Sequence, residues 1–145
     1  MIEYLRCATG EDIDLLFEWV NDEEVRKVSF STDMILYSEH KKWFFNLLKS
    51  ENCKQYIYCV DDEPVGQVRI TIDGNKAGIS YSICAAKRGN GYCKRMLRLV
   101  MLRIKEDFPQ IRTLVAQVKP ENRVSSKIFL ELGYEEIYRQ YEINI

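Results

Sequence analysis

Apolar residues alternate with polar ones at the start of the chain and then recur at helical spacing over most of the next forty positions. The alternation over residues 3–9 predicts a first strand. Thr9, with Asp12 three residues later, is typical of a helix start. Ser38 is expected to cap a later helix that carries a second apolar face. In chain order, the pattern predicts helices over residues 11–22, 22–30 and 39–50.

The period of the pattern changes to two between residues 55 and 83. Three β-rich runs are separated by the turn sequence Asp-Asp-Glu-Pro at residues 61–64 and by Asp73-Gly74. An Asp-Gly pair between alternating runs is a strong hairpin signal, because glycine accepts the positive φ of a tight turn. This region is therefore expected to form an antiparallel meander.

Helix and strand patterns alternate in the last third of the chain. A long helix is predicted over residues 89–107, and a strand over 112–119. Asn122 is expected to cap a second helix that stops at Gly133, and residues 134–145 read as a final strand. A helix between two strands can link parallel neighbours. The predicted fold class is therefore α+β, with a mixed sheet.

The 145-residue length fits one domain, which we expect to cover residues 1–145. With 46% hydrophobic and 30% charged residues and only three prolines, the composition is that of a globular protein. A net charge of −1 gives no general attraction for nucleic acid or anionic membranes, so neither is expected as a partner. The chain lacks a targeting pattern at its start and any run of ~20 apolar residues, so a cytoplasmic protein is expected.

The five cysteines and the single histidine follow no metal-binding or disulfide pattern. No two cysteines form a Cys-x-x-Cys pair, and their number is odd. We therefore expect no metal site and reduced thiols, most of them buried. Only Cys93 calls for a second reading, because it lies in a glycine-rich segment.

That segment is a basic corner between the meander and the long helix, with the sequence Lys-Arg-Gly-Asn-Gly-Tyr-Cys-Lys at residues 87–94. Gly89 and Gly91 let the backbone turn tightly and approach a ligand without an intervening Cβ. Unpaired amides at the helix start, together with the helix dipole, favour a phosphate or pyrophosphate there. An ordinary glycine turn beside a solvated helix face is the alternative. The segment lacks the Walker spacing, and Lys94 stands where a dinucleotide fingerprint has Gly or Ala.

Residues 88–93, Arg-Gly-Asn-Gly-Tyr-Cys, resemble the acetyl-CoA signature of the GNAT N-acetyltransferases, which is Arg or Gln, two free positions, Gly, one free position, then Gly or Ala. Residues 19–30 resemble the Trp-x-Asn-Asp opening of the ribosomal-protein acetyltransferase-like branch of that family. Residues 119–136 resemble the Asn-x-x-Ser … Gly-Phe/Tyr segment near the C-terminus of that branch. Together these similarities extend over nearly the whole chain.

The resemblance implies the GNAT fold, a mixed central sheet flanked by helices, with acetyl-CoA as acetyl donor in a V-shaped opening between central parallel strands. The backbone groups of Ile83 and Cys84 are then the implied partners of the pantetheine arm. Asn122 and Ser125 are implied to line the other side of the cofactor. Cys93 departs from the signature, since it keeps the amide donor but adds a side chain. The implied pyrophosphate cradle consists of the backbone amides of Arg88, Gly89, Asn90, Gly91, Tyr92 and Cys93.

Acetyl transfer to an amine needs a deprotonated nucleophile, a donor to the thioester carbonyl and a proton for the leaving thiolate. Many GNAT members use a tyrosine of the C-terminal helix as the acid, but the aligned residue is Phe129. The resemblance points instead to Ser125. Glu39 and His40 are candidates for the base, and Tyr81 lies beside the expected carbonyl-binding strand. A purely structural role is the alternative for each of these four residues.

Residues 19–30, 37–44 and 66–70 together resemble the acetyltransferases that modify the 4-amino group of UDP-linked dideoxy sugars in pseudaminic-acid-type pathways. An N-acetyltransferase with such an amino sugar as its small-molecule acceptor is the function we expect. A protein N-terminus is the alternative acceptor, and a non-catalytic acyl-CoA-binding module is the alternative of a different class. The final strand has no edge-blocking proline, so a homodimer formed through it is a further hypothesis. Candidate nucleotide contacts are Arg26, Lys27 and Arg69, for which ordinary surface charges are the alternative.

Overall fold

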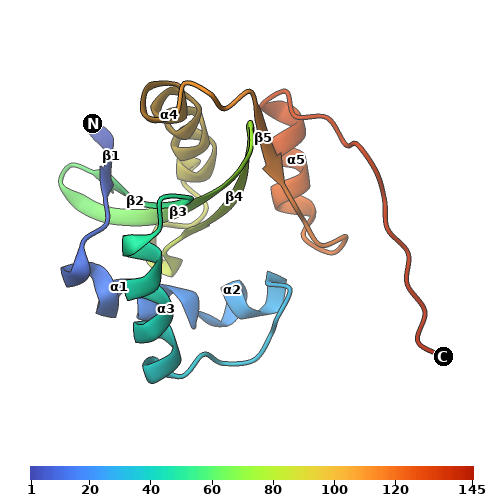
Figure 1. Ribbon diagram of the computed structural model, residues 1–145, viewed down its shortest axis with the longest axis horizontal. Helices are drawn as coiled ribbons and strands as arrows, with labels where there is room; N and C mark the ends of the chain where they lie inside the picture. Colours follow the sequence, from blue (N-terminus) through green and yellow to red (C-terminus); the bar gives the residue numbers. More distant parts are fainter.

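One mixed sheet of five strands forms the centre of the computed structural model, which describes all of residues 1–145 (Figure 1). The strands lie in the order of the chain, the first four as antiparallel neighbours and the last two as a parallel pair. The α+β fold class and the antiparallel meander are thereby confirmed. The strands are β1 (Glu3–Cys7), β2 (Cys53–Val60), β3 (Glu63–Asp73), β4 (Lys76–Ile83) and β5 (Thr113–Ala116).

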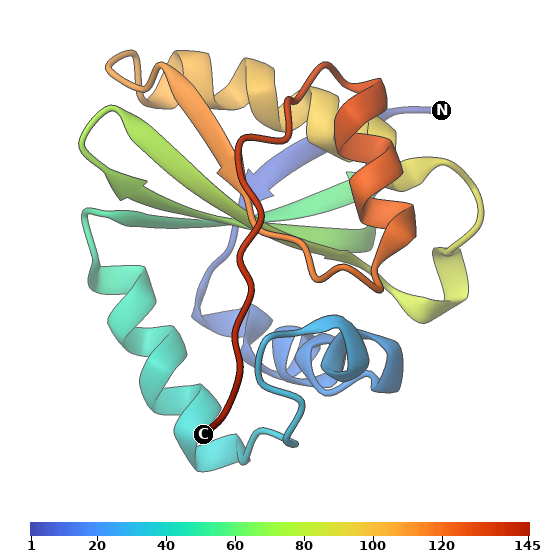
Figure 2. The same ribbon diagram turned by 90° about the vertical axis from the view of Figure 1, so that its right-hand side faces the viewer.

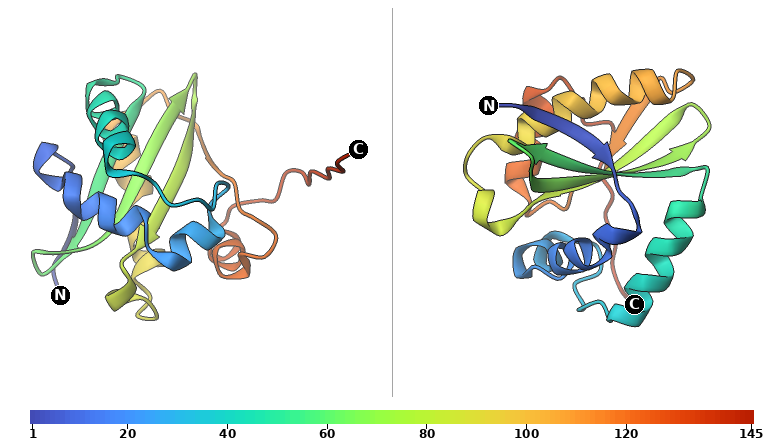
Figure 3. Two further views of the ribbon diagram at one scale, coloured as in Figure 1. Left: turned by 90° about the horizontal axis from the view of Figure 1, so that it is seen from below. Right: turned by 90° about the vertical axis from the view of Figure 1, so that its left-hand side faces the viewer.

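Helices cover both faces of the sheet (Figures 2 and 3). One face carries the three helices of the first third of the chain, and the other carries the two helices of the last third. None of the helices combines the length and the apolar character that a membrane span requires. The helices are α1 (Ile13–Val20), α2 (Glu23–Val28), α3 (Tyr37–Lys49), α4 (Tyr92–Asp107) and α5 (Arg123–Glu131), with short 3-10 turns at Gly10–Asp12 and Ala85–Lys87.

The core consists of two apolar clusters, one on each face of the sheet. The larger cluster packs α4 against the strands, and the smaller one packs α1 and α3 against the opposite face. Burial of these apolar side chains away from water stabilises the packing of the helices on the sheet. The larger cluster includes Tyr56, Tyr58, Val68, Ile70, Met96 and Val100, and the smaller includes Leu16, Trp19, Phe44 and Ile57.

Helix starts in the first third follow the sequence with one exception. Thr9 and Asp12 form the predicted capping box. The prediction that Ser38 caps the third helix is wrong, because α3 begins at Tyr37 and has no side-chain cap. Tertiary contacts explain the earlier start: the Tyr37 hydroxyl donates to Asp14 Oδ1 at 2.8 Å, and its ring packs edge-on against Phe17.

The C-terminal region agrees with the sequence up to the end of α5. Asn122 caps this helix through its side-chain oxygen, and Gly133 follows the helix with a φ of +94°. The strand predicted over residues 134–145 is wrong, because neither helix nor strand follows α5. These residues form an extended tail that leads away from the sheet (Figure 1). A strand pattern becomes a strand only where a neighbour supplies hydrogen bonds, and here no strand lies beside it.

Candidate active site

The pairing of β4 with β5 ends before β4 does. The parallel register runs from Lys76 opposite Thr113 to Ile79 opposite Ala116. Beyond Ile79, β4 continues to Ile83 with no strand on that side. We call this unpaired edge of β4 the β4–β5 divergence. It leaves backbone donors and acceptors free for an extended ligand, as an added strand would use them.

The direction of the backbone groups decides which residues serve the β4–β5 divergence. The Cys84 amide donates to the Val65 carbonyl of β3 at 2.8 Å, so it faces away from the divergence. Because donors and acceptors alternate along a strand, Ile83 and Tyr81 direct their backbone groups toward it. The Ile83 backbone thus faces the divergence, although its carbonyl also accepts from Arg88 Nε at 3.1 Å. The Cys84 amide has a partner within the sheet, and the Tyr81 backbone, which sequence reasoning did not name, faces the divergence as well.

The glycine-rich corner begins one turn beyond the end of β4. Gly89 and Gly91 have φ values of +80° and +77°, a region that residues with a Cβ rarely adopt. No atom lies within 4 Å of a Cβ built at either position, so the space beside the backbone is open. The Asn90 side-chain amide donates to the carbonyls of Lys87 and Arg88 at 3.0 and 3.2 Å and holds the turn.

Helix α4 starts directly after this corner, with Gly91 as its N-cap. The amides of its first turn, including those of Tyr92 and Cys93, have no partner within the helix. Together with the dipole of this 16-residue helix they favour an anion at the corner. The Arg88 amide is the exception in the predicted cradle, since it donates to the Ala85 carbonyl at 3.4 Å.

An ion pair joins the corner to the helices on the opposite face. The Arg88 guanidinium donates to Asp22 Oδ1 at 2.6 Å and to the Ile83 carbonyl at 3.1 Å. Burial raises the pKa of Asp22, but the hydrogen bonds from Arg88 and from the amide of Val25 outweigh it, so the pKa is lowered. Sequence reasoning missed Asp22 in this role. In the structure Asp22 also caps α2, since its side chain accepts from the Val25 amide at 3.3 Å.

Two hydroxyl groups meet between β4 and α5. The Tyr81 phenol oxygen lies 2.5 Å from the Ser125 hydroxyl oxygen. Asn122 Oδ1 accepts from the Ser125 amide at 3.3 Å, which fixes the first turn of α5. Burial raises the pKa of Tyr81, so the phenol keeps its proton at neutral pH. The Cys93 thiol packs against the same apolar core cluster as Tyr81. Burial raises the pKa of this thiol as well, which makes it a weak nucleophile.

Phe129 and Tyr134 extend this cluster as a row of aromatic rings. Phe129, which is 6% exposed, packs edge-on between Tyr81 and Tyr134, with ring centroids 5.7 and 4.9 Å apart. The Tyr134 hydroxyl is buried and makes no hydrogen bond. Burial raises the pKa of Tyr134 to about 12. Phe129 therefore occupies its predicted place in α5, but its ring is part of the packing.

The adjacent residues Glu39 and His40 lie in different surroundings. His40 is 2% exposed, and its Nε2 lies 3.1 Å from the Ile13 carbonyl of α1. Its ring stacks on Phe44, and burial lowers its pKa, so the imidazole is neutral. Glu39 is exposed in the first turn of α3. The structure thus gives His40 a partner in α1 and leaves only Glu39 open to solvent.

The three residues expected to contact a nucleotide also differ from one another. Arg26 is held between the end of α1 and the loop after α2, because it donates to the Val20 carbonyl at 2.7 Å and to the Ser31 carbonyl at 2.9 Å. Lys27 is exposed. Arg69 lies under α3 with its guanidinium carbon 5.1 Å from the centre of the Trp43 ring.

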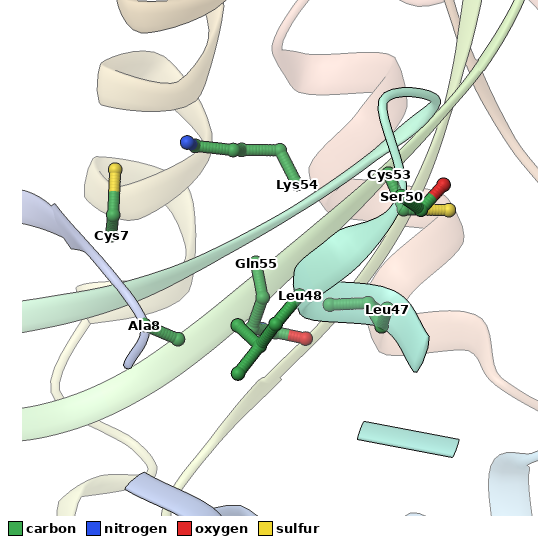
Figure 4. Close-up of a pocket in the computed structure, with 8 residues that line it drawn as sticks. All are labelled: Cys7, Ala8, Leu47, Leu48, Ser50, Cys53, Lys54 and Gln55. Carbon is green, nitrogen blue, oxygen red and sulfur yellow. The ribbon is translucent and has the colours of Figure 1, made fainter. Parts of the chain in front are cut away.

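A small hollow of about 120 Å³ lies between the end of α3 and the starts of β2 and the loop after β1 (Figure 4). None of the residues that line it belongs to the β4–β5 divergence or the glycine-rich corner. Its lining residues are Cys7, Ala8, Leu47, Leu48, Ser50, Cys53, Lys54 and Gln55.

Comparison with known proteins decides the family. A family model described as an acetyltransferase (GNAT) domain matches residues 4–135. The chain belongs to the GNAT acetyltransferase family. Its five-stranded sheet with a parallel β4–β5 pair and flanking helices is the GNAT fold, which confirms the predicted architecture. The search of curated proteins gives no match to this GNAT chain.

Solved structures with the same fold include three acetyltransferases. An aminoglycoside acetyltransferase in complex with coenzyme A is 19% identical, with a TM-score of 0.79 over 92% of this chain and 84% of the other. A spermidine N-acetyltransferase from Vibrio cholerae, in complex with CoA and spermine, is 14% identical, with a TM-score of 0.82 over 98% and 88%. A possible acetyltransferase from Clostridium difficile is 21% identical, with a TM-score of 0.78 over 100% and 99%.

Proposed function

We propose that this GNAT chain transfers an acetyl group from acetyl-CoA to the 4-amino group of a UDP-linked dideoxy amino sugar. The observation that carries the proposed acetyl transfer is the Tyr81–Ser125 hydroxyl pair at the β4–β5 divergence, above a glycine-rich helix start suited to an anion. The acceptor rests on the resemblance of residues 19–30, 37–44 and 66–70 to enzymes of that kind in the ribosomal-protein acetyltransferase-like branch.

Residues of the corner and of β4 fit the two polar parts of the proposed donor. The amides of Gly89, Asn90, Gly91, Tyr92 and Cys93 are proposed to bind the pyrophosphate of the donor. The backbone groups of Tyr81 and Ile83 are proposed to pair with the amides of its pantetheine arm. When bound, acetyl-CoA supplies an activated acetyl group and a thiolate leaving group. The solved aminoglycoside and spermidine acetyltransferases hold coenzyme A, which supports this assignment.

The Tyr81–Ser125 hydroxyl pair is proposed to supply the proton that the leaving thiolate needs. Burial keeps the Tyr81 phenol protonated, so it can donate to Ser125 Oγ. The Ser125 hydroxyl hydrogen is then free to move toward the leaving sulfur. Ser125 is therefore the proposed acid, and Tyr81 is the residue that positions it.

Proton removal from the acceptor amine is assigned to Glu39. Its carboxylate is exposed at the start of α3, where water can carry the proton to it. His40 is proposed to position α3, because its ring bonds to the Ile13 carbonyl and packs against Phe44. Glu39→Gln is expected to lose acetyltransferase activity. Lys41→Gln, one helix position beyond His40, is the control and is expected to keep it.

The test of the proposed function is incubation of the protein with acetyl-CoA and a panel of amines, read by mass. The panel contains UDP-4-amino-dideoxy sugars, N-terminal peptides, polyamines and aminoglycosides. A mass gain of one acetyl group on the sugar nucleotide supports the proposal. Acetylation of a peptide instead would identify a protein N-terminal acetyltransferase and overturn the choice of acceptor.

A non-catalytic acyl-CoA-binding module is the second candidate, and Phe129 is the observation that favours it. Its ring is buried in place of the tyrosine acid of many GNAT members. Coenzyme A binding in calorimetry with no acetylated product from any amine would favour this candidate over the enzyme.

We also propose that two copies of the chain associate through residues 134–145. Exposed apolar side chains recur along this tail, and the outer edge of β5 has no neighbouring strand. An unpaired edge and an unpaired strand pattern can complete each other. Light scattering is expected to give the mass of a dimer, and a monomer mass for the chain shortened after Glu135. A monomer mass for the full chain would contradict this assembly.

A further inference from the structure

Arg69 is a partly buried arginine with no ionic partner. It lies on β3 beneath α3, and no hydrogen bond or ion pair involves its guanidinium. The arginines at positions 6, 88, 95, 103 and 139 all pair with carboxylates, although most of them are near the surface. A buried charge is costly when it is left unpaired. Contact with the Trp43 ring offsets only part of this cost.

The guanidinium borders an open hollow of about 440 Å³ at the end of α3. No acidic side chain lines it, whereas several groups can donate hydrogen bonds. The last carbonyls of α3 give this end a partial negative potential, and Lys49 in the last helical turn offsets it. The hollow therefore has the chemistry of an anion site. Its lining residues are Trp43, Asn46, Leu47, Ser50, Cys53, Arg69 and Thr71.

The sheet register connects this hollow to the β4–β5 divergence. Arg69 lies directly opposite Ser80, and Gln67 lies opposite Ser82, to which it donates at 3.1 Å. Tyr81, which takes part in the proposed chemistry, lies between these two serines in β4. Adjacent strands are about 4.8 Å apart, so the Arg69 backbone lies one strand from β4. The Arg69 side chain contacts Trp43 of α3, whereas the Tyr81 side chain contacts Phe129 of α5 on the other face of the sheet. An acceptor bound at Arg69 would therefore approach the β4–β5 divergence from the α3 side.

We propose that Arg69 and Trp43 form the subsite for a diphosphate carried by the acceptor. The proposal rests on the proposed acetyl transfer and names the substrate class, which is an amine attached to a nucleoside diphosphate. Arg69 donates to the phosphate oxygens with its planar fork, and Trp43, which is 40% exposed, supplies an aromatic face beside it. An unpaired cation at this place repels polyamines and aminoglycosides, which are polycations.

Binding of UDP to the full chain tests the subsite without any acetyl transfer. Titration of UDP is read by calorimetry and by tryptophan fluorescence, since Trp43 is exposed and the other tryptophan, Trp19, is buried. We expect UDP to bind and inorganic pyrophosphate to compete with it. Arg69→Gln is expected to weaken UDP binding by about 10- to 100-fold, the range typical of charge-assisted hydrogen bonds. The UDP affinity of Arg69→Lys is expected to lie between those of the wild type and Arg69→Gln. Trp43→Phe is expected to reduce the fluorescence change.

Arg112→Gln is the matched control. It removes the same charge from an exposed arginine at the start of β5, and UDP affinity is expected to stay unchanged. Removal of Arg69 leaves no carboxylate unpaired, so Arg69→Gln is expected to fold, and circular dichroism checks this. Equal UDP affinity in the wild type and in folded Arg69→Gln overturns the subsite, as does a wild type that does not bind UDP.

The subsite and the proposed function fail in distinguishable ways. If a UDP-amino sugar is acetylated and Arg69→Gln leaves its KM unchanged, the function stands and the subsite is wrong. If UDP binding depends on Arg69 but no amino sugar is acetylated, the subsite stands and the proposed acceptor is wrong. A rise in KM for the sugar nucleotide with little change in kcat supports both.

Discussion

The phenol oxygen of Tyr81 lies 2.5 Å from the hydroxyl oxygen of Ser125, and this contact joins β4 to α5 beside the β4–β5 divergence. The two residues are 44 positions apart in the sequence. Burial raises the pKa of Tyr81, so the phenol keeps its proton, and either hydroxyl of the pair can be the donor. In the proposed reaction the phenol donates to Ser125, and the serine hydrogen is then available to a third group. The pair would thereby form a short proton path that ends at Ser125.

Replacement of the two hydroxyls separates their roles. Ser125→Ala is expected to lower kcat by about 100-fold or more, the usual contribution of a general acid. Tyr81→Phe is expected to lower kcat by about fivefold, because it removes one orienting hydrogen bond of ~1 kcal/mol. Steady-state kinetics with the acceptor found in the amine panel gives both values, and KM for acetyl-CoA should change little.

Ser126→Ala is the control for this pair. Ser126 is the next residue of α5, and its hydroxyl bonds only to the Asn122 carbonyl, at 3.4 Å. This variant is expected to keep the wild-type kcat. Equal activity of Ser125→Ala and Ser126→Ala would show that Ser125 is not the acid.

Gly91 is expected to be needed both for its backbone conformation and for ligand approach. Gly91→Ala places a Cβ at a φ of +77°, which destabilises the fold by roughly 1–2 kcal/mol and puts a methyl group beside the amides of the corner. Coenzyme A binding in calorimetry should weaken at least tenfold.

The matched control is Gly74→Ala in the β3–β4 turn, where φ is +63° and a Cβ likewise meets no atom within 4 Å. It should lose the same stability in urea unfolding and keep full coenzyme A affinity. If the two variants lose affinity equally, the corner is not the pyrophosphate site.

The sequence predicted those parts of the fold that depend on local signals. The Thr9 capping box, the Asp73-Gly74 hairpin and the Asn122 cap are each determined by a few neighbouring residues. The start of α3 was misplaced because contacts of Tyr37 with α1 determine it. Residues 134–145 were misread because an alternating pattern does not say whether a partner strand is available.

In the candidate site, too, features with a local sequence signal were predicted and features that depend on distant contacts were not. Gly89 and Gly91 were found because two glycines directly before a long helix are a strong local signal for a tight turn. The contact of Asp22 with Arg88 was not found, because residues 66 positions apart in the sequence carry no local signal that they are in contact. His40 was taken as a candidate base because it lies in the first turn of a helix expected to rim the cleft, whereas helix rotation turns its ring into the interior.

The Asp22–Arg88 ion pair is expected to hold the corner in place for the donor. Asp22→Asn keeps the cap of α2 but removes the charge that Arg88 binds. Because partly exposed ion pairs contribute up to about 1 kcal/mol, coenzyme A affinity should fall by a factor of about 2–5. KM for acetyl-CoA should rise while kcat stays the same. Glu136→Gln, which removes the carboxylate of the exposed Arg139 pair, should change neither, and an equal effect of both variants would argue against a role for Asp22.

Asp12 is expected to make stability depend on acid pH. The Arg6 guanidinium donates to both of its carboxylate oxygens at 2.8 Å, and the Thr9 amide donates to one of them. The Arg6 hydrogen bonds, together with that amide, hold the pKa of Asp12 below its ordinary value of 3.8 despite burial. A carboxylate whose pKa is lowered by folding stabilises the protein above its unfolded pKa, and this stabilisation is lost as the pH falls through the folded pKa.

Urea unfolding at several pH values measures this contribution. At pH 7, Asp12→Asn should be less stable than the wild type by about 2 kcal/mol, the contribution of hydrogen bonds to a charged group. The difference should stay constant down to about pH 5 and shrink below pH 4 as the wild-type carboxylate gains its proton. Glu51→Gln, at an exposed carboxylate with no ion pair, should follow the wild type throughout. A difference between wild type and Asp12→Asn that is the same at pH 7 and pH 3 would mean that the charge of Asp12 does not stabilise the fold.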